Sequence, residues 1–160
     1  MTGRAIHRHV LVDADAVVDA QVDAAIDALA RAMDALAVAP EAEVSIVIAD
    51  DDYVHRLNLA YRGYDKPTDV LSFRAEADVD GWPGSGAILG DIVISLPYAG
   101  RSAAARRAPV VDELRLLVVH GLLHLLGHDD ADEAGAEAMR REEVRLGVRT
   151  AEDAAADAVR

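Results

Sequence analysis

An apolar segment at residues 116–126 is interrupted by two histidines spaced four residues apart, His120 and His124. On an α-helix, residues four apart lie on one face, one turn above the other, so both imidazoles can reach one ion. Two histidines on one stripe of a leucine-rich helix are costly in a core unless something satisfies them. The segment therefore predicts a buried helix that carries part of a metal site.

The third ligand is expected from the chain beyond this helix. His128 continues the same line, but at about 1.5 Å per residue it would lie about 12 Å along the axis from His120. One ion with ligand bonds of about 2 Å cannot collect all three histidines from that line. Gly127 can adopt the left-handed conformation that ends a helix and turn the chain back. We expect Asp130 as the third ligand, with Asp129 and His128 as the alternatives.

Two histidines and one carboxylate leave a fourth position for water, which is typical of a catalytic rather than a structural zinc site. The competing interpretation is that these are ordinary histidines on a half-buried helix, and the glycine and acidic cluster that follow them disfavour it. In helical zinc proteases a glutamate follows the first histidine and serves as general base, whereas Gly121 stands there in this chain. A peptidase or amidase is therefore the weaker alternative to another metal-dependent hydrolase.

Hydrophobic patterning predicts a single α+β domain over residues 1–160. Hydrophobic residues make up 52% of the chain, enough for one core, and aromatic residues only 4%, so the core must be aliphatic. We expect a small mixed sheet of three to four strands packed against about five helices, with the metal site on a late helix, in a zincin-like metal-hydrolase arrangement. The chain after about residue 150 has the composition of a frayed tail.

Strands are expected where β-branched and apolar residues are bounded by turn formers, at 10–12, 44–49, 70–73 and 90–95. Helices are expected where apolar residues recur at helical spacing, at 14–37, 51–61, 97–108, 109–126 and 132–146. Residues 78–86 combine aspartate, glycine, proline and serine, which predicts an exposed excursion between two strands.

Cysteine is absent, which excludes disulfides, thiolate metal ligands and a cysteine nucleophile. The N-terminal residues lack the apolar region of a signal peptide. The apolar segment at 116–126 is far too short to span a bilayer. We therefore expect a cytoplasmic protein with no membrane partner, and the sequence leaves its oligomeric state open.

The formal net charge of −13 argues against a broad nucleic-acid-binding surface, because phosphate contacts need lysine and arginine. Four arginines nevertheless fall within fifteen positions: Arg101, Arg106, Arg107 and Arg115. They form either an RNA-facing patch or a solvated helix face, and the sequence favours neither.

Three motifs in the same order resemble the YbeY family of metal-dependent endoribonucleases, also called rRNA maturation factors. The segment from His120 to Asp129 resembles the family signature His-Gly-x-x-His-x-x-Gly-x-Asp-His. Two further stretches match, at residues 57–73 and 89–94, so that the likeness covers about residues 44–145. Three motifs in matching order are a far stronger signal than one.

The resemblance implies a single-domain α+β fold, one zinc ion and endonucleolytic hydrolysis of single-stranded RNA. It also implies roles in maturation of the 3′ end of small-subunit (16S) rRNA and in ribosome quality control, with rRNA and the small ribosomal subunit as partners. A non-catalytic ribosome assembly factor, in which the metal mainly stabilises the fold, is the remaining alternative. The native metal, the cleavage position and the general base stay open.

The family's first two metal ligands correspond to His120 and His124. Its third ligand is usually histidine, and Asp130 stands there in this chain. A carboxylate is still a competent zinc ligand, but it is harder than imidazole and admits Mn²⁺ or Mg²⁺ more readily. The resemblance therefore implies a zinc site whose metal preference is broadened by Asp130.

Arg62 matches a family arginine thought to act at the active site. An arginine can bind a scissile phosphate through two hydrogen bonds and stabilise the charge that develops in the transition state. The alternative is a loop arginine that pairs with Asp65 or Asp69. Asp91, just inside a predicted strand, either orients a metal-binding histidine or belongs to a turn.

Overall fold

The computed structural model describes residues 3–75 and 88–158. The predicted excursion at 78–86 lies outside these ranges. The elements follow the order β1 (Ala5–Val10), α1 (Ala16–Ala35), β2 (Glu43–Ala49), α2 (Asp51–Arg62), β3 (Val70–Arg74), β4 (Ile88–Ser95), α3 (Leu96–Ala105), α4 (Val110–Leu125), α5 (Glu133–Arg145) and α6 (Ala151–Ala158).

The four strands form one mixed sheet in the order β1-β2-β4-β3. Strands β1, β2 and β4 are parallel, whereas β3 runs antiparallel to β4 and forms an edge of the sheet. The predicted α+β class is confirmed, with its mixed sheet and with a late helix, α4, that carries two of the three possible metal ligands, His120 and His124. The segment predicted as a frayed tail is helical at Ala151–Ala158.

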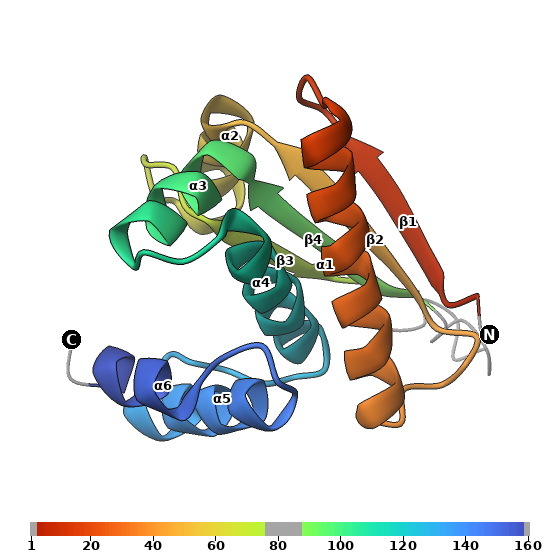
Figure 1. Ribbon diagram of the computed structural model, residues 1–160, viewed down its shortest axis with the longest axis vertical. Coiled ribbons are helices and arrows are strands. Elements are labelled where there is room, and N and C mark those ends of the chain that lie inside the picture. The colour runs from red at the N-terminus through yellow and green to blue at the C-terminus, as the bar shows by residue number, and fades with distance from the viewer. Residues whose placement is uncertain (1–2, 76–87, 159–160) are drawn as a thin grey trace.

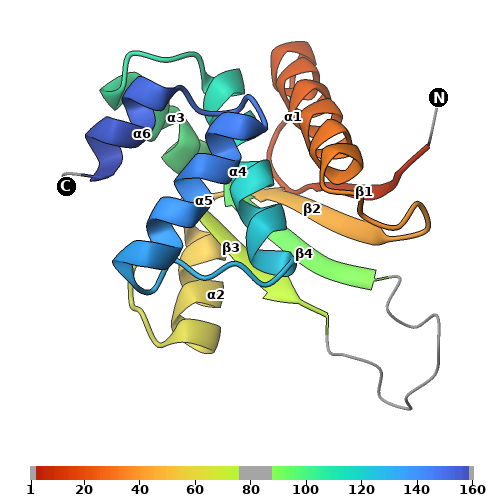
Figure 2. The same ribbon diagram turned by 90° about the horizontal axis from the view of Figure 1, so that it is seen from below.

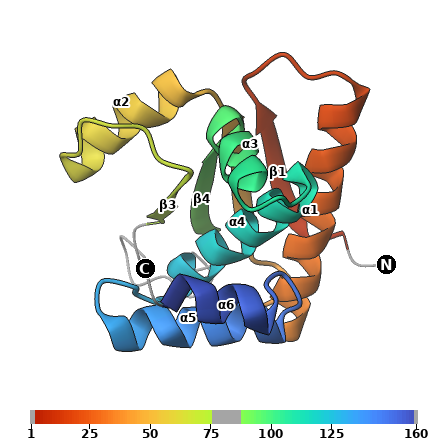
Figure 3. The same ribbon diagram turned by 60° about the vertical axis from the view of Figure 1, so that its left-hand side comes forward.

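Helices cover both faces of the sheet. Helices α1 and α4 pack against each other over one face (Figure 1), and α2 lies on the opposite face (Figure 3). Side chains alternate between the two faces along each strand, so Ile46 and Ile92 enter the larger core while Val93 packs with Val54 of α2. This alternation explains why the β2 and β4 segments are apolar on both sides.

Helices α5 and α6 form a further layer on α4, away from the sheet (Figure 1, Figure 2). Helix α5 contacts α4, and α6 packs on α5. None of the helices within 3–75 and 88–158 is both long enough and apolar enough to cross a membrane. Through α5, the C-terminal layer packs on α4, the helix that contains His120 and His124.

The first strand was predicted at 10–12, and the structure corrects this to Ala5–Val10. The segment is rich in histidine and arginine, which obscured the alternation. Arg8 lies on the side that faces α1, and its guanidinium reaches Asp19 at 2.7 Å and also pairs with Asp23. The arginine stem can cover apolar surface while its charged end meets the acidic face of α1, so a charged residue occupies a half-buried strand position.

Helix α4 lies close to the sheet at Gly121. A Cβ added to Gly121 would stand 2.7 Å from Ile92 Cγ2 and 3.1 Å from Ser72 Oγ. Ser72 Oγ also donates a hydrogen bond to the Gly121 carbonyl at 3.3 Å. The glycine thus allows α4 to contact both β3 and β4 directly next to the first histidine of the motif.

Gly121→Ala tests this contact. The added methyl must displace Ile92 or the helix, and overpacking of this kind costs about 1–3 kcal/mol, against about 1 kcal/mol that alanine gains over glycine in a helix. We expect the free energy of unfolding to fall by about 1 kcal/mol, measured by urea denaturation of the metal-free protein.

Gly100→Ala in α3 is the matched control, because a Cβ there meets nothing within 4 Å. Helix propensity then acts alone, and we expect stabilisation of about 1 kcal/mol. Equal stabilisation by both substitutions would contradict the close approach of α4 to the sheet.

Candidate metal centre

The end of α4 turns the chain back toward the two histidines. Gly127 has a φ of +102°, in the region that favours glycine. The Gly127 amide donates to the His124 carbonyl at 3.0 Å, and the His128 amide donates to the Leu123 carbonyl at 3.0 Å. This pair of hydrogen bonds is a Schellman motif. The predicted reversal at Gly127 is therefore present.

Three donor atoms converge beyond this turn. The Nε2 atoms of His120 and His124 are 3.1 Å apart, and Asp130 Oδ2 lies 3.6 Å from the first and 3.5 Å from the second. Donors about 2.0–2.1 Å from a tetrahedral ion are separated by about 3.4 Å. The triangle formed by these atoms fits one such ion, so the cluster could hold a metal.

The hydrogen bonds at the far side of each ring favour the same tautomer. His120 Nδ1 lies 2.7 Å from Glu143 Oε1, and His124 Nδ1 lies 3.0 Å from the His128 carbonyl oxygen. A carboxylate and a carbonyl can only accept, so each Nδ1 carries the proton and each Nε2 presents a lone pair. Two lone pairs that face each other need a cation between them, which agrees with the metal-ligand arrangement.

Glu143 was not identified from the sequence as a residue of this site. It is buried, with only 1% of its surface exposed. Burial alone would raise the pKa of Glu143, but the hydrogen bond and charge of His120, together with Arg149, hold that pKa below its ordinary value. Burial likewise opposes the charged form of His120, yet Glu143 and Asp130 raise its pKa. The surroundings of His120 thus stabilise positive charge, whether a proton or a metal ion supplies it.

A sequence signal for Glu143 does exist. In α5 the buried side chains are Met139 and Glu143, which are four residues apart on one face. A carboxylate on the buried stripe of an amphipathic helix requires a partner. The pattern indicates an internal ion pair or hydrogen bond, but it cannot identify His120 as the partner, because that contact depends on how α5 packs on α4.

The loop that carries Asp130 is held by its neighbours. Asp129 Oδ1 accepts from the Ala131 amide at 2.9 Å, and Asp132 caps α5 by accepting from the Gly135 amide at 2.7 Å. A Cβ on Gly135 would stand 1.9 Å from the Asp129 carbonyl oxygen, so only glycine permits this approach. The Asp129 side chain is thus used within the loop.

The two alternative third ligands are placed differently from Asp130. Among the described residues, the cluster that could hold a metal contains His120, His124 and Asp130, and neither Asp129 nor His128 belongs to it. The main chain of His128 contributes instead, through the carbonyl that orients His124. The choice of Asp130 remains a prediction about binding, supported by this geometry.

A groove of about 820 Å³ opens beside the cluster and follows edge strand β3. Arg62 and Arg74 line it, and within the described residues neither forms an ion pair with a carboxylate. Arg62 lies over the Tyr64 ring at 5.1 Å. Its alternative partner Asp65 instead lies 2.6 Å from His55 Nε2. The groove therefore offers two arginines to an anionic ligand.

Two aromatic side chains stand on the rim of the same groove. Tyr61 and Phe73 meet edge to face, with ring centroids 5.3 Å apart. Tyr61 is 70% exposed. The exposed Tyr61 ring and the half-buried Phe73 ring, beside arginines that form no ion pair within the described residues, give a surface on which unstacked bases can lie.

Other residues considered from the sequence lie away from the cluster. Asp91 lines a separate groove on the α2 face of the sheet, together with His9 and Val47, so the proposal that it orients a metal-binding histidine is not supported. Three of the four grouped arginines pair with acids: Arg101 with Asp51, Arg106 with Glu113 and Arg115 with Asp112. The described contacts favour a solvated, ion-paired surface over an RNA-facing patch.

Comparison with known proteins bears on this arrangement. The family model for YbeY, described as Endoribonuclease YbeY, matches residues 12–150. Endoribonuclease YbeY of Moorella thermoacetica is 48% identical over 120 residues, covering 69% of this chain and 76% of that protein. The Pelotomaculum thermopropionicum protein of the same name is 50% identical over 107 residues, covering 64% and 68% of the two chains. That of Desulfitobacterium hafniense is 44% identical over 119 residues, covering 72% and 76%.

The solution structure of TM1509 from Thermotoga maritima has a similar fold. It matches with a TM-score of 0.54 at 21% identity, over 94% of this chain and 90% of that one. At this identity the likeness concerns the fold alone. The family match, by contrast, includes every residue of the metal cluster and the groove. The chain therefore belongs to the YbeY family of endoribonucleases.

Proposed function

We propose that this chain is a single-domain, metal-dependent endoribonuclease that cleaves single-stranded RNA. One observation carries the proposal: the Nε2 atoms of His120 and His124 and Oδ2 of Asp130 lie within 3.6 Å of one another at one end of a groove lined by arginines. The resemblance of the site to the family motif and the membership of the family support the same conclusion.

The donor set favours Zn²⁺. Two imidazole nitrogens suit zinc, while the carboxylate of Asp130 also admits Mn²⁺ or Mg²⁺. When bound, such an ion supplies a Lewis acid and lowers the pKa of water at its open position. Glu143 and the His128 carbonyl hold the two imidazoles so that their Nε2 lone pairs face that ion.

Arg62 and Arg74 are proposed to bind the RNA backbone. Both line the groove and can donate hydrogen bonds to phosphate oxygens, and Arg62 is the residue that would stabilise charge developing on the scissile phosphate. Tyr61 and Phe73 offer rings for stacking by neighbouring bases. A double helix keeps its bases stacked inside, so this groove favours an unpaired strand.

A peptidase of the helical zinc type is disfavoured by the packing at Gly121. A side chain at position 121 would clash with Ile92 and Ser72, so a glutamate cannot stand there as the general base. The alternative of a non-catalytic assembly factor predicts that the metal is needed for folding but not for RNA processing. A catalytic role and a purely structural role of the metal can be separated by variants that lose the metal or Arg62 without unfolding.

The biological substrate is proposed to be the 3′ end of 16S rRNA in the small ribosomal subunit, with a further role in ribosome quality control, both in the cytoplasm. The test is cleavage of small subunits that carry an unprocessed 3′ end, with naked single-stranded and double-stranded RNA of the same sequence beside them. Faster cleavage of the subunit supports the proposal, and equal cleavage of every RNA contradicts it.

Asp130→Ala tests the third metal ligand. We expect close to one zinc per chain in the parent protein and a loss of affinity beyond the about 10–100-fold typical of residues that only orient a ligand, measured by elemental analysis and competition with a chelator. Asp129→Ala is the matched control and should retain its zinc, because Asp129 faces the Ala131 amide. Retention of zinc in Asp130→Ala would transfer the ligand role to His128 or Asp129.

Arg62→Ala tests the catalytic arginine. We expect kcat on single-stranded RNA to fall about 100-fold or more, because an interaction with developing charge is lost, while zinc content and the urea midpoint stay unchanged. Arg56→Ala on the same helix is the control, since Arg56 lies over Tyr53 at 6.0 Å and is not part of the groove. Equal activity of the two variants would remove Arg62 from the mechanism.

A further inference from the structure

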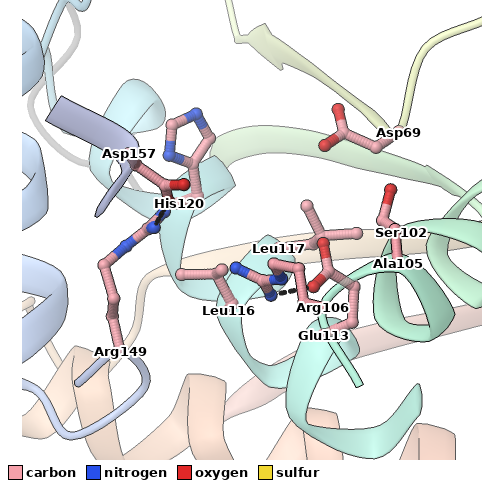
Figure 4. Close-up of a pocket in the computed structure, with 10 residues that line it drawn as sticks. All are labelled: Asp69, Ser102, Ala105, Arg106, Glu113, Leu116, Leu117, His120, Arg149 and Asp157. Carbon is pink, nitrogen blue, oxygen red and sulfur yellow. Dashed lines mark hydrogen bonds and ion pairs between the residues drawn. The ribbon is translucent and has the colours of Figure 1, made fainter. Parts of the chain in front are cut away.

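A chain of charged side chains runs from His120 to the C-terminal helix. Glu143 Oε1 faces His120 Nδ1 at 2.7 Å, and Glu143 Oε2 accepts from Arg149 Nε at 2.7 Å. Arg149 Nη1 in turn donates to Asp157 of α6. Figure 4 shows Arg149 and Asp157 together on the side of a pocket that His120 also lines.

Burial decreases along this series of side chains, from Glu143 to Asp157. Glu143 is 1% exposed, and the side chains of Arg149 and Asp157 are 11% and 26% exposed. Each oxygen of the Glu143 carboxylate has one hydrogen-bond partner, the His120 imidazole on one side and the charged Arg149 guanidinium on the other. Because a buried carboxylate is costly without such partners, its position is set by both of them.

The last link lies in a segment of its own. The family match ends at residue 150, so α6 (Ala151–Ala158) and Asp157 lie beyond it. A helix of this length is marginal by itself and depends on packing and side-chain contacts for its place. The described contacts that hold α6 include its packing on α5 and the Arg149–Asp157 ion pair.

We propose that Glu143, Arg149 and Asp157 form a positioning relay through which helix α6 sets the orientation of His120 and thereby the metal affinity of the site. The proposal rests on the proposed metal binding. Glu143 fixes the imidazole by accepting its Nδ1 proton, Arg149 fixes the carboxylate, and Asp157 fixes the guanidinium. Each of the three residues acts through the next one and none of them is a metal ligand or a catalytic residue.

The relay differs from the support of the second histidine. His124 Nδ1 is held by the carbonyl of His128, within the turn that ends its own helix. His120 Nδ1 is held only through side chains from α5 and, beyond it, from α6. A perturbation of α6 should therefore alter the binding of a metal through His120 while leaving His124 in place.

Glu143→Gln is the first test, with Co²⁺ as a spectroscopic probe of the full-length protein. We expect Co²⁺ affinity to fall about 10–100-fold, as for partners that orient a ligating histidine, with a changed visible absorption band. Glu142→Gln is the matched control, because the neighbouring Glu142 pairs with Arg145 on the exposed side of α5. Long-range ¹H–¹⁵N spectra of the metal-free protein at alkaline pH should show a smaller population of the Nδ1–H tautomer of His120 in Glu143→Gln than in the control, because the glutamine amide can also donate to Nδ1.

Asp157→Asn tests the far end of the relay without removing a buried group. We expect Co²⁺ affinity to fall about tenfold, the lower end of the effect of such partners, while Asp153→Asn in the same helix leaves it unchanged. In a double-mutant cycle, Asp157→Asn should have little further effect once Glu143→Gln is present, because both act through one path.

The outcomes separate the relay from the metal site. A parent protein that does not bind Co²⁺ would overturn both. A parent that binds Co²⁺, with Glu143→Gln equal to Glu142→Gln, would overturn the relay alone. Equal affinities of Asp157→Asn and Asp153→Asn, or additive losses in the double variant, would remove α6 from the relay.

Discussion

The contact between α4 and the sheet at Gly121 determines where the chemistry of this chain can occur. The missing Cβ lets the helix lie directly on Ile92 and Ser72, and this brings His120 next to the edge strand β3. The groove exists because a helix end and a strand edge lie side by side there. A larger residue at position 121 would push α4 away from the sheet. The imidazoles of His120 and His124 would then lie farther from Arg62 and Arg74 across the groove.

Much of the site follows from local sequence rules. The helix through His120 and His124, its end at Gly127 and the return of Asp130 all depend on helix geometry and on the preference of glycine for positive φ. Such rules involve residues within about one turn of helix, so they can be applied from the sequence alone. The same holds for most of the strands and helices, whose apolar periodicity gave the mixed α+β fold.

What the sequence did not predict depends on contacts between distant segments. Glu143 is separated from His120 by 23 positions, and only the packing of α5 on α4 shows which group it serves. Strand β1 was placed too late because Arg8 looks like a surface residue until its partners on α1 are known. In both cases a charged side chain is buried or half-buried by a partner that no local pattern identifies.

The net charge of −13 describes this surface poorly. Acids serve as helix caps at Asp15, Asp50 and Asp132, and others pair with three of the four grouped arginines. Arg62 and Arg74 are left without such partners in the described structure, and both line the groove. Local potential at the groove, rather than total charge, is therefore what an approaching phosphate would meet.

The unequal support of the two imidazoles has a consequence for how the site is assembled during synthesis. The ring of His124 is oriented by the turn that follows it, so it takes its place as soon as residues 110–128 have folded. The ring of His120 waits for a side chain that is translated 23 residues later. A nascent chain shorter than this would hold one prepared imidazole and one free to rotate, so that tight capture of an ion becomes a late event that reports completion of the C-terminal layer.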